Sequence, residues 1–162
     1  MQSFQQQIES EARIEQIPLE TILKENKYYL KQVQNAVIKN VGVSLPFAAE
    51  IANHIIGSEN NQTRSLVLLK TARLFKKPDQ AVFEIGSIIE LLNTASKLHQ
   101  QIKTTAKTRY LKKNNNIWGN EVRVLLGDYL LSISFQILTQ LGNLDVLECI
   151  SLATKNISHG QV

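Results

Sequence analysis

The sequence PDQAVFEIGSIIELLNTASKL occupies residues 78–98 and carries a long apolar pattern with helical spacing. Pro78 and Asp79 are typical of a helix start. The apolar residues that follow fall on more than one face of the helix: Val82, Ile85, Ile88, Ile89, Leu92 and Ala95. A helix that is apolar on several faces has to be covered on several faces. We therefore expect residues 78–98 to form the central, buried helix of an all-helical domain.

Helical spacing continues on both sides of this stretch. Apolar residues recur at helical intervals over residues 20–39, 46–57, 66–74, 117–141 and 144–157. Gly142 and Asn143 predict a helix stop followed by a new cap, and residues 112–116 predict a loop. Strand patterns are weak. We predict an all-α fold of about six or seven helices, in a single domain over residues 1–162.

Composition predicts a soluble globular protein. Of the 162 residues, 43% are hydrophobic and 20% are charged, which is ordinary for a folded domain. No stretch approaches the ~20 continuous apolar residues that predict a membrane-spanning helix, and residues 1–11 lack the apolar core of a signal peptide. The lone Cys149 fits a reducing compartment, and its apolar neighbours predict a buried side chain. We expect a cytoplasmic location.

Positive charge is concentrated in one part of the chain. The formal net charge is +4, and residues 97–123 hold seven basic residues against one acid, Glu121. Such a stretch fits a solvated surface, a diphosphate site or a nucleic-acid interface, and charge alone leaves these alternatives open. Common catalytic and metal-binding motifs are absent, and His54, His99 and His159 are too far apart for a local metal motif.

Residues 90–99, ELLNTASKLH, are similar to the pattern E-x-I/L-H-T-A-S/T-L-L/I-H of the trans-polyprenyl diphosphate synthases. Further matches follow in order at residues 118–120 (WGN), 127–131 (GDYLL) and 157–162 (ISHGQV). The chain therefore resembles the N-terminal half of a long-chain synthase, octaprenyl- or solanesyl-like, over residues 44–162. The resemblance implies part of an isoprenoid-synthase-like helical bundle, with the family's second aspartate-rich motif in the other half.

The resemblance also shows what this sequence has replaced. Where the family carries its first D-D-x-x-D motif, the chain has Gln100, Gln101 and Thr104. The family's aspartates hold Mg²⁺ ions that bridge to the allylic diphosphate, a task for anionic oxygen ligands. Neutral side chains cannot supply that charge. We therefore expect no bound Mg²⁺, no other cofactor and no catalytic residues.

The diphosphate-binding positions are only partly kept. The family's G-G-K-x-x-R-P stretch aligns with residues 59–65, where Arg64 remains but Asn61 replaces the lysine and Ser65 the proline. After the aspartate motif, one of two paired arginines remains as Arg109. His99 matches a histidine that helps bind isopentenyl diphosphate in the family. Arg64, His99 and Arg109 are therefore the candidates for residual, weak diphosphate binding.

These losses favour a non-catalytic, shortened homologue in isoprenoid biosynthesis, acting as a partner or regulatory subunit. We expect a homodimer or a heteromer with a full-length polyprenyl synthase. A decaying fragment without a selected function is an alternative, as is one part of an active prenyltransferase completed by a second polypeptide. A basic helical nucleic-acid-binding module using Tyr110 and Trp118 is disfavoured, because Trp118 matches a family aromatic. We expect no nucleic-acid partner.

Overall fold

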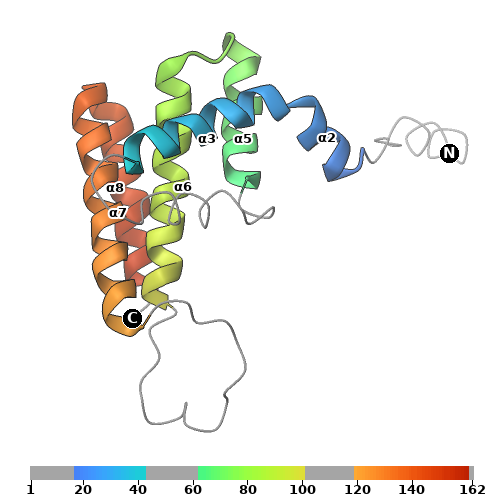
Figure 1. The fold of residues 1–162 in the computed structure, drawn as a ribbon. Helices are drawn as coiled ribbons and strands as arrows, with labels where there is room; N and C mark the ends of the chain where they lie inside the picture. The colour runs from blue at the N-terminus through green and yellow to red at the C-terminus, as the bar shows by residue number, and fades with distance from the viewer. Residues whose placement is uncertain (1–16, 43–61, 101–118, 161–162) are drawn as a thin grey trace, which may run out of the picture.

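The computed structural model describes residues 17–42, 62–100 and 119–160, and every regular element in these ranges is a helix (Figure 1). The predicted all-α fold is confirmed. The predicted helix at residues 46–57 and the loop at residues 112–116 lie outside the described ranges. The helices are α2 (Leu19–Glu25), α3 (Lys27–Val41), α5 (Thr63–Phe75), α6 (Gln80–Gln100), α7 (Asn120–Leu141) and α8 (Leu144–His159).

Helix α6 is the centre of the bundle, as its apolar pattern predicts. It contacts α3, α5, α7 and α8, and Ile88 and Leu91 are completely buried. The Val82 backbone N–H donates to Asp79 Oδ1 at 3.2 Å, which explains why the helix begins at this point. Gly86 lets α3 approach closely, because a Cβ there would lie 2.9 Å from Val33 Cγ2. A main core joins α6 to α7 and to the end of α3, and a second one joins α3 to α5.

The single helix expected at residues 20–39 is two helices, broken at Asn26. The Asn26 side chain is fully buried, its Nδ2 donates to the Ile22 carbonyl at 2.7 Å, and its Oδ1 accepts from Arg73 Nη1 at 3.0 Å. An asparagine that bonds its own backbone competes with the helix ladder. The expectation of one continuous helix was therefore wrong, and the break lets α2 and α3 run in different directions (Figure 1).

The boundary between α7 and α8 forms as predicted. Gly142 has a φ of 62°, the left-handed conformation that ends many helices, and Asn143 Oδ1 accepts from the Val146 N–H at 3.1 Å. Helix α7 is long and apolar enough to cross a membrane by length and composition, which is weak evidence for a single helix. Leu126, Leu130 and Leu138 of α7 are buried against the rest of the bundle.

The prediction that Cys149 is buried was wrong. Cys149 is exposed, and α8 has no fully buried residue. Val146, Leu147 and Ile150 pack against the core, but other apolar side chains of α8 are exposed, among them Leu144 and Leu152, which are 76% and 56% exposed. An apolar run in the sequence indicates that a helix face can be buried. It does not show that another helix covers that face.

Candidate functional site

A groove with a volume of about 360 Å³ lies between α5, α6 and α8. Its apolar lining combines one face of α6 with the adjoining face of α8: Ile89, Leu92, Ile150, Ala153 and Ile157. Its polar lining comes from the start of α5, the second half of α6 and one residue of α8: Arg64, Asn93, Ser96, Lys97, Gln100 and Thr154. The α6 residues recur every three or four positions, which places them on one helical face. The groove is therefore a mainly apolar trough with cationic, amide and hydroxyl groups along it.

The described residues of the groove do not offer the ligands that Mg²⁺ requires. Arg64 and Lys97 carry the charge of this described lining, and none of its residues has a carboxylate. Mg²⁺ prefers carboxylate oxygens in octahedral geometry, and nearby cations oppose its binding. Gln100 stands at the first position of the resembled aspartate motif and lines the groove beside Lys97. Within the described ranges, no group of three or more His, Cys, Asp and Glu residues could hold a metal ion.

Two of the predicted site residues meet at this groove. Arg64 comes from the first turn of α5 and Gln100 from the last turn of α6, and both line it. Gln101, Thr104 and Arg109 lie outside the described residues, so their placement stays a prediction.

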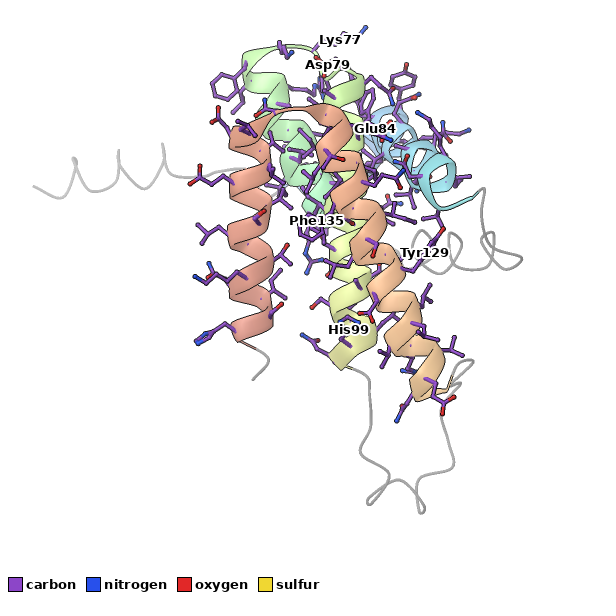
Figure 2. All side chains as sticks on the ribbon, turned by 90° about the vertical axis from the view of Figure 1, so that its left-hand side faces the viewer. Lys77, Asp79, Glu84, His99, Tyr129 and Phe135 are labelled. Carbon is purple, nitrogen blue, oxygen red and sulfur yellow. The ribbon has the colours of Figure 1, made fainter. Side chains whose placement is uncertain are left out.

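His99 does not line the groove. It faces α7, where its Nε2 lies 3.3 Å from Asp128 Oδ1 (Figure 2 labels His99 near the end of α6). Gly127 makes room for the ring, since a Cβ at that position would collide with the imidazole. His99 Nε2 is buried, and its alignment with Asp128 does not meet the geometry of a hydrogen bond. His99 therefore joins α6 to α7 in this structure, and its role in diphosphate binding remains a prediction.

The sequence reasoning missed most of the groove's polar lining. Asn93, Lys97 and Gln100 recur at helical spacing on one face of α6, so the pattern could have grouped them. Lys97 is a charged residue on a mainly apolar helix and was not among the predicted site residues. The structure places it, exposed, at the groove. Thr154 lines the groove from α8, and nothing in the surrounding sequence predicts this position.

A buried carboxylate lies just behind the groove. Glu90 of α6 is 6% exposed, and its Oε1 accepts a hydrogen bond from Ser65 Oγ of α5. Its Oε2 is buried without a hydrogen-bond partner among the described residues. Burial raises the pKa of Glu90, although the Ser65 hydrogen bond and the positive charges of Arg64 and Lys97 act in the opposite direction. Ser65, which replaces the proline of the resembled motif, thus joins the start of α5 to α6.

Replacing this carboxylate, Glu90→Gln, should stabilise the fold at neutral pH by the order of 1 kcal/mol. Because the pKa of Glu90 is raised in the folded protein, protonation favours folding, and stability falls as pH rises above the ordinary glutamate value of 4.5. The amide avoids this cost and can still accept from Ser65. The gain, measured by urea unfolding of variant and wild type, should be largest near pH 7 and shrink toward pH 4.

Glu84→Gln is the matched control. Glu84 is also buried on α6, but its oxygens accept from Asn40 Nδ2 at 2.8 Å and Gln80 Nε2 at 2.9 Å and pair with Lys39. Loss of that charge should destabilise the protein instead. Equal effects of the two substitutions at every pH would contradict the assignment of a costly buried charge to Glu90.

The protein is a helical bundle with a mainly apolar groove. The central helix α6, the start of α5 with Arg64, and α8 line this groove. A model of the polyprenyl synthetase family matches residues 46–162. Because this match covers most of the chain, the chain belongs to the polyprenyl synthetase family.

Long-chain synthases are among the relatives. The chain is 28% identical to octaprenyl diphosphate synthase of Escherichia coli (strain K12) over 131 residues, which is 80% of this chain and 41% of that protein. It is 28% identical to mitochondrial solanesyl-diphosphate synthase 1 of Oryza sativa subsp. japonica over 172 residues, 94% of this chain and 39% of that protein. The chain therefore spans about two-fifths of the length of these relatives.

Solved structures agree with this placement. A decaprenyl diphosphate synthase from Rhodobacter capsulatus superposes with a TM-score of 0.73 at 25% identity, covering 88% of this chain and 45% of that one. A polyprenyl synthase from Caulobacter crescentus, solved with calcium and isoprenyl diphosphate, gives 0.74 at 21% identity, covering 89% and 47%. The described helices thus have the fold of one part of these synthases.

Proposed function

We propose that this chain does not itself catalyse prenyl transfer and that its groove binds diphosphate-type anions without a metal. One observation carries the proposal: the groove places Gln100 where the resembled motif has an aspartate, beside Lys97 and near Arg64, and none of the lining residues that the structure describes has a carboxylate. Two cations can attract a diphosphate directly, and the apolar wall suits an attached hydrocarbon. Mg²⁺-dependent prenyl transfer requires negatively charged ligands for the metal, whereas Arg64 and Lys97 are positively charged.

We further propose that the chain acts as a partner subunit, as a homodimer or with a full-length polyprenyl synthase. The uncovered apolar side chains of the last two helices support this, since Leu125 and Leu144 are 69% and 76% exposed. Apolar surfaces of this kind often mark protein contacts. Co-purification with a full-length synthase, together with a changed rate or product length of that enzyme, would support the proposal. No complex and no effect would refute it.

The purified chain should form no product from an allylic diphosphate, isopentenyl diphosphate and Mg²⁺. The Escherichia coli octaprenyl diphosphate synthase, assayed in parallel by radiolabel incorporation, serves as the positive control. The triple substitution Gln100→Asp, Gln101→Asp and Thr104→Asp should leave the chain alone inactive, because the resembled second aspartate-rich motif lies in the other half of the family's sequence. Product formed by the chain alone would contradict the proposal.

Activity that arises only when a second polypeptide is added favours a different function, a prenyltransferase assembled from two chains. In that case the triple substitution should raise the rate of the mixture, because it supplies carboxylates to an otherwise complete site. An unchanged rate would assign the activity to the added polypeptide.

A further inference from the structure

The turn between α5 and α6 exposes two large apolar side chains at one end of the bundle. Leu74 and Phe75, the last residues of α5, are 82% and 85% exposed, the highest values among the exposed large hydrophobic residues of the described ranges. Figure 1 shows this turn at the top of the molecule, and Figure 2 labels Lys77 and Asp79 there. Single exposed apolar residues are common on protein surfaces, but two adjacent ones at a projecting tip form a local apolar wedge.

The charged residues around this wedge are mostly lysines. Lys70, Lys76 and Lys77 are exposed, and Asp79 is the single acid between residues 70 and 79. Asp79 Oδ2 pairs with Lys76 Nζ at 2.7 Å. Arg73 contributes less to the outer surface, because it bonds Asn26 and stacks 5.3 Å from the Tyr29 ring. The tip therefore combines two apolar side chains with a net positive surround.

We propose that this tip, defined by residues 70–79, docks on a lipid surface that carries negative charge. Large apolar side chains can enter the boundary between headgroups and acyl chains, and flanking lysines bind anionic headgroups while their stems stay in contact with apolar groups. The surrounding lysines favour an anionic bilayer over an uncharged apolar protein surface. Contact at the tip leaves the groove open, because the groove follows the second half of α6 and the tip precedes its first residue.

The proposal is independent of diphosphate binding and is tested on the full chain with vesicles. Sedimentation with phosphatidylcholine vesicles should show little binding, and vesicles that also contain phosphatidylglycerol should bind the chain in a salt-sensitive manner. The double variant Leu74→Ser, Phe75→Ser should lower partitioning by about tenfold. Substitution of Lys76 and Lys77 by serine should lower it by about fivefold for each lysine.

Leu152→Ser is the matched control, since Leu152 is an exposed leucine of α8 and does not belong to the tip segment, residues 70–79. It should bind like the wild type, and thermal unfolding should show that all variants remain folded. A second readout is Phe75→Trp, whose added fluorescence should be quenched by brominated lipids more strongly than the signal of Trp118 in the wild type.

Three results would overturn the proposal. Equal binding to neutral and anionic vesicles would exclude the role of the lysines. Unchanged binding of the Leu74→Ser, Phe75→Ser variant would show adsorption by charge alone, without insertion of the tip. A soluble oligomer that the same variant dissociates in light scattering would assign the tip to a protein contact.

Discussion

Replacing Leu91 with alanine is expected to lower the free energy of unfolding by about 2–5 kcal/mol. Leu91 is completely buried in α6 and belongs to the main core with Leu130 of α7 and Val41 of α3. Removing its side chain loses apolar burial and leaves a cavity between helices that are distant in the sequence. The substitution therefore tests whether α6 is the element on which the described helices assemble.

Urea unfolding followed by circular dichroism measures this effect. Val67→Ala is the matched control, because Val67 is a helical aliphatic residue that is 64% exposed on α5. It should change the free energy of unfolding by less than about 0.5 kcal/mol. Comparable losses for both substitutions would contradict the central position of α6.

Reversing the charge of the groove, Arg64→Glu, is expected to weaken inorganic diphosphate binding by at least about tenfold. Arg64 lines the groove in the first turn of α5, close enough to influence Glu90 electrostatically. The substitution removes a cation that can face the ligand and places a second acid near Glu90, so it acts on both attraction and repulsion. Isothermal titration calorimetry with inorganic diphosphate measures the change in Kd.

Lys31→Glu is the control for the change in net charge. Lys31 is exposed on α3, and it is not part of the groove lining. Binding should stay within about twofold of the wild type at moderate salt, where distant surface charges are screened. If Lys31→Glu and Arg64→Glu weakened binding equally, the anion would be responding to overall charge and not to the groove.

Apolar periodicity and helix-end chemistry predicted much of the fold. The pattern at residues 78–98 corresponds to α6, and Gly142 with Asn143 marks the observed α7–α8 boundary. The break at Asn26 was not predictable from periodicity, because the buried Asn26 side chain accepts a hydrogen bond that Arg73, 47 residues away, donates. The exposure of Cys149 was not predictable either, because it depends on which helices cover α8.

The site was predictable only where a motif marked it. The resemblance identified Arg64 and Gln100, and both line the groove. Lys97 was not predicted as a site residue, and the structure places it in the groove lining. Thr154 requires knowledge of how α8 packs on α6, and the orientation of His99 depends on the space that Gly127 leaves. Packing between helices, unlike spacing along one helix, cannot be read from a single sequence.

Titration of the chain with inorganic diphosphate, with and without Mg²⁺, tests the central claim most directly. The claim is that Arg64 and Lys97 replace a metal in holding the anion at a groove whose described lining has no carboxylate. Binding should therefore persist when Mg²⁺ is removed with a chelator, weaken as salt is raised, and fall in Arg64→Glu. Binding that requires Mg²⁺, or that strengthens when Mg²⁺ is added, would contradict the account.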